Sequence, residues 1–311
     1  MIQLDKCTLE DGNCYANCPR TFTDLDKLNR TIFGEPFGTS DLGTFRATYL
    51  ARSTDPALRE RTGSGGVVAT LLASSLKAGI IDAVIGTTTS AESGNGLLDR
   101  NVVSSLRLEG TPSAKVTSDP DEAAALSSAI HRFARVLSGF NSLPKESART
   151  IGMTCLPCQV TSIRKRIGTP QPNRASIDSV RLLIAEFCAA KRWLEPCEDR
   201  QKANKACSYC WDYSGEFADV SVGSGRAANK GWDAVIVRTE AGEKALQAAV
   251  QSGAIETRPL PQENIEAEKK ASRDKKKRAL RNIVEKTGST VDLLYLGMPK
   301  ALADALAGEE R

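Results

Sequence analysis

Two cysteines separated by two residues, Cys207 and Cys210, are the part of this sequence best suited to metal chemistry. Thiolates at this spacing can bind one metal ion or one iron–sulfur cluster, because a short loop brings both sulfur atoms to the same side. A short apolar segment follows them and ends in Gly223-Ser224-Gly225, a turn of the kind that can cradle a phosphate. The pair supplies half of a four-ligand site, so other segments must supply the rest.

A second Cys-x-x-Cys pair, Cys155 and Cys158, follows one predicted strand and precedes a predicted helix. Open α/β sheets bind ligands at the carboxyl ends of their strands, so thiolates at this junction are well placed for a cofactor. Cys188 ends the next predicted strand, and Cys197 lies in the polar connection before Cys207.

Three further cysteines lie near the N-terminus, at Cys7, Cys14 and Cys18. The ending Cys-x3-Cys-Pro matches the last part of a bacterial ferredoxin run, but the preceding interval is stretched to six residues. We interpret these cysteines as three ligands of a second cluster, which Cys188 or Cys197 would complete. A structural zinc site and reduced cysteines without a ligand role are the alternatives.

The number of cysteines bears on the compartment and on the metal. The start of the chain lacks a signal-peptide profile and no apolar window is long enough for a membrane span, so we expect a cytoplasmic protein. Nine cysteines in that compartment favour metal or redox chemistry over disulfides. The main alternative to a [4Fe–4S] cluster is zinc bound by both Cys-x-x-Cys pairs, although about fifty residues separate them.

The composition is that of a soluble globular protein with a substantial core. Of 311 residues, 41% are hydrophobic and 26% are charged, and the net charge is +4. Many of the basic residues fall within residues 269–281, so we expect a solvated basic helix and no nucleic acid partner.

A glycine-rich segment, Gly63-Ser64-Gly65-Gly66, precedes a helix predicted from Val67 to near Gly79. Glycines at a helix start let backbone N–H groups approach a phosphate, and the helix dipole favours its negative charge. A simple turn is the alternative interpretation. The single histidine, His131, falls in a predicted helix, where a packed or surface role is commoner than catalysis.

Predicted strands and helices alternate along most of the chain, which favours an α/β fold with a mixed sheet flanked by helices. We expect a cysteine-bearing N-terminal extension at residues 1–42, a central domain at 43–260 and a helical C-terminal tail at 261–311. The predicted strands are at residues 44–52, 80–86, 102–108, 150–154, 180–188, 217–225, 232–239 and, at a sheet edge, 255–260; the later helices are at 119–137, 160–167, 240–252, 262–286 and 291–307.

Several segments between residues 43 and 290 occur in an order that resembles one known family. They are Tyr49-Leu50-Ala51-Arg52-Ser53-Thr54-Asp55-Pro56, Gly65-Gly66-Val67-Val68 with Ile80-Ile81-Asp82, Leu156-Pro157-Cys158-Gln159, Cys207-x-x-Cys210, Ala218-Asp219-Val220-Ser221-Val222-Gly223 and Gly231-Trp232-Asp233-Ala234-Val235-Ile236-Val237-Arg238-Thr239. Together they resemble the coenzyme F420 hydrogenase/dehydrogenase β-subunit family.

The resemblance implies a subunit that carries FAD and one or two [4Fe–4S] clusters, with coenzyme F420 as a candidate substrate. It places Cys158, Cys207 and Cys210 on the family's cluster ligands. The segments that it implies for flavin contact supply Arg52, Ser53, Thr54, Ser64, Gly65, Gly66, Val67, Ser221, Gly223 and Ser224.

The sequence departs from the family pattern at three places. Gly63-Ser64-Gly65-Gly66 replaces the usual Gln-Asp-Gly-Gly, so the fourth ligand must come from elsewhere, with Cys155 and Cys188 as candidates. A usual Gly-(Ser/Thr)-(Lys/Arg)-Tyr turn is replaced by a segment that keeps only Arg132 as its cation. The segment between Cys188 and Cys207 has only eighteen residues, which leaves the hydride carrier open.

We therefore expect an iron–sulfur flavoprotein subunit that transfers electrons between a hydride carrier and the clusters of a larger oxidoreductase. Its partners would be other subunits, of a hydrogenase, a formate dehydrogenase or a heterodisulfide reductase-like complex. An electron-wire or scaffold subunit without its own hydride-carrier site and a zinc-stabilised binding module are the alternatives.

Overall fold

The computed structural model describes residues 18–89, 112–126, 136–143, 150–167, 175–189, 205–289, 291 and 293–308. The strand predicted at residues 102–108 and His131 lie outside these ranges.

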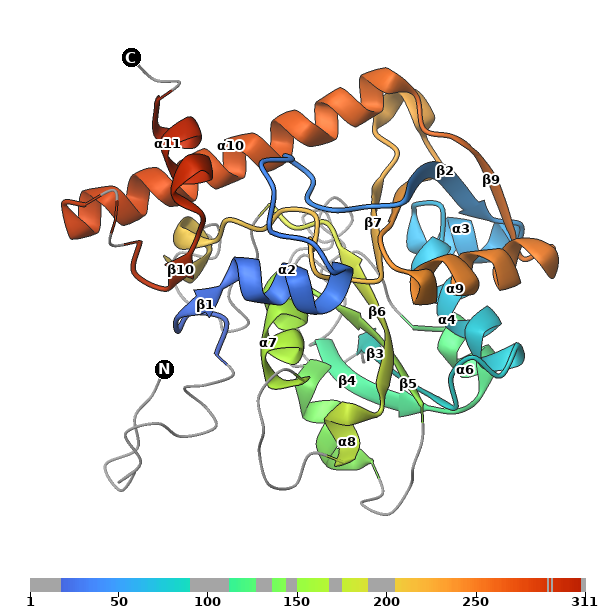
Figure 1. Ribbon diagram of the computed structural model, residues 1–311. Coiled ribbons are helices and arrows are strands. Elements are labelled where there is room, and N and C mark those ends of the chain that lie inside the picture. Colours follow the sequence, from blue (N-terminus) through green and yellow to red (C-terminus); the bar gives the residue numbers. More distant parts are fainter. Residues whose placement is uncertain are drawn as a thin grey trace, which may run out of the picture.

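A mixed eight-stranded sheet forms the centre of the described structure, in the order β4-β3-β5-β6-β7-β8-β2-β9 (Figure 1). Its strands are β2 (Ala47–Ser53), β3 (Ala83–Thr89), β4 (Pro112–Thr117), β5 (Ile151–Cys155), β6 (Val180–Glu186), β7 (Val220–Ser224), β8 (Asp233–Val237) and β9 (Ile255–Pro259). The predicted α/β fold with a mixed sheet is thus confirmed, and β9 lies at a sheet edge as expected.

Strand direction determines which loops meet. Strands β3, β5, β6 and β7 are mutually parallel, and β8 runs antiparallel to both β7 and β2. Strand β2 therefore points the same way as β7. The ends of β5, β6, β7 and β2 lie along one edge of the sheet, which we call the carboxyl edge.

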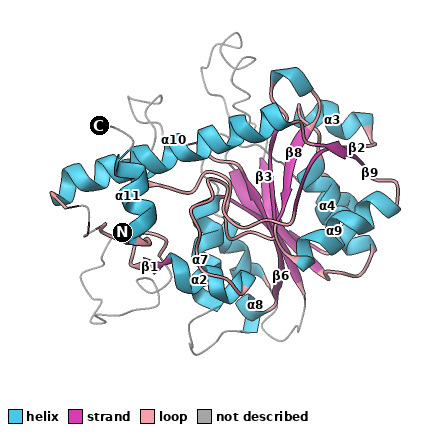
Figure 2. Cartoon of the chain, turned by 45° about the horizontal axis from the view of Figure 1, so that its top comes forward, coloured by secondary structure: helices cyan, strands magenta, loops and turns pink. Residues whose placement is uncertain are grey.

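Helices cover both faces of this sheet (Figure 2). Helices α4 (Val67–Lys77) and α9 (Glu240–Gln251) pack on one face over a core of branched aliphatic side chains. Helix α7 (Pro157–Ile167) packs on the other face, where the core extends to aromatic side chains and to the C-terminal helices. The other helices are α2 (Leu25–Phe33), α3 (Pro56–Thr62), α6 (Pro120–Ala124) and α8 (Ala175–Asp178), with 3-10 turns η1 (Val136–Ser142), η2 (Lys205–Tyr209) and η3 (Ala227–Asn229).

The two ends of the described chain meet. Strand β1 (Thr23–Asp24) pairs in parallel with β10 (Leu296–Gly297). Helix α10 (Gln262–Thr287) runs along the top of the molecule in Figure 1, and α11 (Lys300–Gly308) packs against its C-terminal half. Among the described helices, none has the length and apolar character needed to cross a membrane.

Two of the helices were predicted too long. The helix predicted at residues 119–137 ends at Ala124, because the chain turns there to bury Leu126 against the backbone of Gly86. The terminal helix begins only at Lys300. Leu296 and Gly297 pair with β1 instead, and Pro299 lacks the N–H that a helix running through it would need.

Candidate functional site

The carboxyl edge gathers the cysteines of the central sheet. Cys155 is the last residue of β5, and Cys158 lies in the first turn of α7, which begins three residues earlier than predicted. Strand β6 pairs in parallel with β5 and is followed by Cys188, whose backbone N–H bonds to the Tyr213 carbonyl at 2.8 Å. These contacts bring three separate cysteine-bearing segments to one place.

Four thiols converge there: Cys158, Cys188, Cys207 and Cys210. Burial, followed by the neighbouring thiols of Cys210 and Cys188, raises the pKa of Cys158 to about 12. Cys207 is joined to the group through Arg20, whose guanidinium interacts with Cys210, Cys158 and Cys207. The quartet offers four soft donors of the kind that iron–sulfur clusters use, and metal binding would deprotonate them.

Cys155 and Cys18 are placed differently from the quartet. The side chain of Cys155 is buried in the core beneath α7, and burial, then Cys158, then Glu186 raises its pKa. Cys18 lies near the other end of α7, where its carbonyl accepts a hydrogen bond from Lys165 Nζ at 2.9 Å. Of the two candidates for the fourth position, Cys188 is the one joined to both other segments, through its interaction with Cys158 and the hydrogen bond of its N–H to the Tyr213 carbonyl.

The spacing of these donors bears on the kind of metal. Across the described residues, no three His, Cys, Asp or Glu side chains converge closely enough to hold a single ion. A tetrahedral zinc site draws all four sulfurs to about 2.3 Å from one ion. A cluster binds each thiolate to a different iron atom, so its four sulfurs lie farther apart than those of a zinc site.

Aromatic packing holds the Cys207–Cys210 loop in place. The loop forms the 3-10 turn η2, and the ring of Trp211 lies 5.7 Å from Phe37 and 6.0 Å from Phe217. The Tyr295 hydroxyl donates a hydrogen bond of 2.6 Å to the Tyr209 carbonyl inside the loop. The loop that carries Cys207 and Cys210 is thus fixed to the hydrophobic core.

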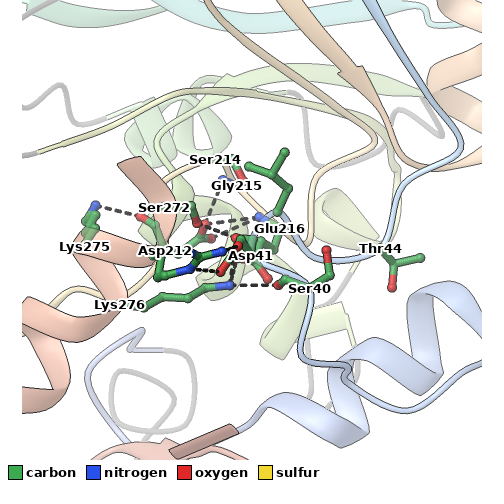
Figure 3. Close-up of polar contacts among 12 residues, drawn as sticks. Ser40, Asp41, Thr44, Asp212, Ser214, Gly215, Glu216, Ser272, Lys275 and Lys276 are labelled. Atoms are coloured by element: carbon green, nitrogen blue, oxygen red, sulfur yellow. Dashed lines mark hydrogen bonds and ion pairs between the residues drawn. The ribbon is translucent and has the colours of Figure 1, made fainter. Parts of the chain in front are cut away.

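A buried network of charges lies directly after this loop, as Figure 3 shows. The Asp212 carboxylate accepts hydrogen bonds from the backbone N–H groups of Gly215 and Glu216. Lys276 Nζ forms an ion pair of 2.7 Å with Glu216 Oε1 and donates to the carbonyls of Ser40 and Asp41. The segment at Ser40 and Asp41, the turn after Asp212 and helix α10 are joined here.

Burial controls the protonation of this network. Burial raises the pKa of Glu216 to about 7, although Lys276 opposes the shift. Burial also lowers the pKa of Arg238 to about 10, and its guanidinium donates to the carbonyls of Leu42 and Thr44 and to the hydroxyls of Ser214 and Ser221. The Ser221 hydroxyl, which the resemblance implied for flavin contact, therefore has an internal partner.

The other segments implied for flavin contact also meet at the carboxyl edge. Ser53 ends β2 and Thr54 follows it, while Gly223 and Ser224 end β7. Strand β8 lies between these strands, with Asp233 paired to Ser224. The backbone N–H of Ser53 donates a hydrogen bond of 2.7 Å to the Gly65 carbonyl, which brings the start of α4 to the same place. These segments lie beside the cysteines, because β7 is the direct neighbour of β6.

Asp233 occupies part of the helix start that was expected to cradle a phosphate. Its carboxylate accepts hydrogen bonds from the backbone N–H groups of Gly65 at 3.0 Å and Val67 at 3.1 Å. A Cβ atom on Gly65 would lie 2.8 Å from the same carboxylate, so the glycine is required by this contact. Burial raises the pKa of Asp233 to about 6. The phosphate role of this segment stays a prediction.

Arg52 and Thr54 also have internal partners. The Arg52 guanidinium lies 4.4 Å from the centre of the Trp232 ring and pairs with Glu256. The Thr54 hydroxyl donates to the Gly253 carbonyl at 2.8 Å. Four of the predicted site residues, Cys7, Cys14, Arg132 and Cys197, lie outside the described residues.

Sequence reasoning missed the buried lysines of α10. Residues 262–286 were expected to form a charged helix without chemistry, yet Lys275 and Lys276 are almost fully buried. A signal was available, because Ala279 and Ile283 mark the buried side of the helix. Counting back from Ala279 by three residues reaches Lys276, and four residues further back lies Ser272; both are buried.

The fold and site together define a class: a mixed α/β protein with four thiols gathered at the carboxyl edge of its sheet. Two family models, both for the "Coenzyme F420 hydrogenase/dehydrogenase, beta subunit", match the chain. The model of the N-terminal part matches residues 48–131, and the model of the C-terminal part matches residues 191–263. The chain belongs to the coenzyme F420 hydrogenase/dehydrogenase beta subunit family.

Named relatives agree with this membership. The chain is 27% identical to the beta subunit of the coenzyme F420 hydrogenase of Methanothermobacter thermautotrophicus, over 78% of this chain and 95% of the relative. It is 28% identical to a subunit of the F(420)H(2) dehydrogenase of Methanosarcina mazei, over 77% and 72%. Both relatives are subunits of oxidoreductases.

A solved structure shares the fold. A chain of the F420-reducing [NiFe] hydrogenase complex from Methanosarcina barkeri superposes with a TM-score of 0.65 at 20% identity, covering 80% of this chain and 94% of that chain.

Proposed function

We propose that this protein is an iron–sulfur flavoprotein subunit that transfers electrons between a hydride carrier, coenzyme F420 or a similar molecule, and the iron–sulfur clusters of a larger oxidoreductase. The observation that carries the proposal is the convergence of four thiols beside the β2, β7 and β8 segments implied for flavin contact. The named relatives, which are subunits of F420-linked enzymes, support it.

The proposed cluster ligands are Cys158, Cys188, Cys207 and Cys210. Thiolate is the usual cluster ligand, and these side chains come from three segments that the fold fixes independently. A flavin bound at the neighbouring strand ends would accept two electrons from a hydride carrier and release them singly. The protein's own residues would bind and orient both groups and exclude water from the space between them.

The proposed partners are other subunits of the same oxidoreductase, which would accept or supply the electrons. A second cluster bound by Cys7, Cys14 and Cys18, a cytoplasmic location and the division into three domains stay predictions.

One observation favours the electron-wire alternative. The Asp233 carboxylate already engages the N–H groups of Gly65 and Val67, where a flavin phosphate was expected. A protein that binds the cluster but no flavin would relay electrons between partners without meeting a hydride carrier.

Anaerobic purification with the natural partner subunits tests the proposal, through an absorbance spectrum and measurement of iron, acid-labile sulfide and flavin. We expect both iron–sulfur and flavin, and reduction of the flavin by reduced F420. Iron without flavin would favour the wire, and zinc without iron or sulfide would favour a binding module. Either result would overturn the proposal.

A matched pair of variants tests the ligand assignment. Cys188→Ser should lose most of the iron and sulfide, whereas Cys155→Ser, at the nearby buried cysteine, should retain them. The opposite pattern would transfer the fourth position to Cys155.

A further inference from the structure

Two cations flank the thiol quartet from segments outside both matched family ranges. Arg20 belongs to the N-terminal segment and Lys275 to α10, whereas the matches cover residues 48–131 and 191–263. Both cations contact the backbone of cysteine-bearing segments, so their positions are tied to the thiols.

Lys275 is a buried cation, only 4% exposed, and it joins two of the cysteine-bearing segments. Its Nζ donates to the Cys188 carbonyl at 2.5 Å and to the Asp212 carbonyl at 2.6 Å. The charge of Lys275 also acts on the Cys158 thiol. The carboxylate of Asp212 feels this charge but is itself bound by the N–H groups of the turn that follows.

Arg20 approaches the quartet from the opposite end of the chain. Its guanidinium donates to the Tyr295 hydroxyl at 2.6 Å and to the carbonyl of Ala206, the residue immediately before Cys207. Burial works against the charged guanidinium, but Tyr295 and the thiols outweigh burial and raise the pKa of Arg20. Neutral oxygens thus bind the guanidinium, and its charge acts on three of the thiols.

Neither cation has a conventional counter-ion among the described residues, where no carboxylate lies within ion-pair distance of Arg20 or Lys275. By comparison, Lys276, the neighbour of Lys275, pairs with Glu216. A buried cation is costly unless an anion is close to it. Within the described part of the chain, both cations act on the Cys158 thiol, which metal binding would deprotonate. Arg20 also acts on Cys207 and Cys210, and the Asp212 carboxylate acts on Lys275.

We propose that Arg20 and Lys275 form a pair of positioning cations that stabilise the anionic cluster bound by the quartet and raise its reduction potential. This inference rests on the proposed function. Four thiolates outweigh the cluster's own positive charge, and each added electron makes the site more negative. Fixed positive charges nearby therefore favour the reduced form.

Redox titration of the purified complex with dithionite and mediators, followed by the spectrum of the reduced cluster, tests this inference. Arg20→Gln and Lys275→Met should each lower the equilibrium constant for one-electron reduction at least tenfold, which is about 59 mV towards negative potential. Lys270→Met removes an exposed lysine from the same helix and should leave the potential unchanged. Arg20→Lys keeps the charge and should restore most of the potential.

Iron and sulfide content distinguishes failure of the proposed function from failure of this inference. Absence of a cluster from the unaltered complex would refute the proposed function. A full cluster with unchanged potential in Arg20→Gln and Lys275→Met would refute only this inference. If Arg20→Gln fails to retain a cluster, retention in Arg20→Lys supports the need for charge, whereas loss in both overturns it.

Discussion

Removing Lys276 should expose how strongly the buried network depends on its ion pair. The Lys276 and Glu216 side chains are each 1% exposed, and their charged atoms are 2.7 Å apart. Lys276→Met leaves a buried carboxylate without its counter-ion and leaves the carbonyls of Ser40 and Asp41 without this donor. Breaking one partner of a buried pair typically costs about 3–5 kcal/mol.

The loss should depend on pH. Burial already raises the pKa of Glu216 from 4.5 to about 7, so the folded state takes up a proton in this range that the unfolded state does not. The contribution of this group to stability is therefore fully present below about pH 4.5 and falls as pH rises towards 7. Without Lys276 the pKa of Glu216 rises further, and the carboxyl group escapes part of its cost by staying protonated.

We expect Lys276→Met to lower the free energy of unfolding by about 3 kcal/mol near pH 8 and by about 1–2 kcal/mol near pH 5, where the lost hydrogen bonds remain. Urea unfolding of the full chain, followed by tryptophan fluorescence at both pH values, measures this. The double variant Lys276→Met/Glu216→Met removes both charges and should recover most of the loss.

An exposed pair on the same helix provides the control. Lys270 and Asp274 lie 2.6 Å apart with side chains 75% and 57% exposed, so Lys270→Met should cost less than about 1 kcal/mol. A loss in Lys276→Met no larger than in this control, or one that is the same at both pH values, would refute the reasoning. No recovery in the double variant would also contradict it.

Three further substitutions test other buried contacts. Asp233→Asn should lower the free energy of unfolding by about 1–2 kcal/mol, because it weakens the cap of α4. Burial raises the pKa of Asp233 from 3.8 to about 6, so the unaltered protein loses stability as pH rises through this range. The variant should show less of this loss, measured by urea unfolding. Gly43→Ala should lower the free energy of unfolding by more than about 1 kcal/mol, measured by thermal unfolding. The reason is that φ is +70° and the new Cβ would lie 2.7 Å from Glu216 Oε2. Asp219→Asn should cost about 2–4 kcal/mol in urea unfolding by weakening a buried pair with Arg164 at 2.9 Å.

Local sequence was sufficient for most of the elements. Asp55 followed by Pro56 is a local signal for a helix start, and the structure shows Asp55 as the N-cap of α3. The apolar runs that predicted β5, β6 and β8 are almost completely buried. Such signals depend on neighbours a few residues apart, which is why they can be interpreted without the fold.

Helix boundaries that depended on distant partners were predicted poorly. Nothing near Ala124 ends a helix as a proline or glycine would, and the chain turns there because Leu126 packs against Gly86. Likewise, Leu296 and Gly297 leave the predicted helix because β1 supplies a pairing partner from the other end of the chain.

The candidate site divides in the same way. Spacing alone identified Cys207 with Cys210, and the position after a strand identified Cys158, because both signals are local. The proposed preference for Cys188 over Cys155 depends on the tertiary structure, in which Cys155 ends its strand inside the core while Cys188 acts on Cys158 and bonds to the segment after Cys210.

The sequence alone could not predict which charged side chains lie around the site. Arg20 and Lys275 do not stand out in a chain with 42 basic residues. Their proposed importance arises because folding withdraws them from water and places thiols near them, with no described carboxylate within ion-pair distance. Residue types and short spacings thus determined which atoms are available for chemistry, and the tertiary structure decided which of those atoms meet, because electrostatic contact and burial depend on distances in space.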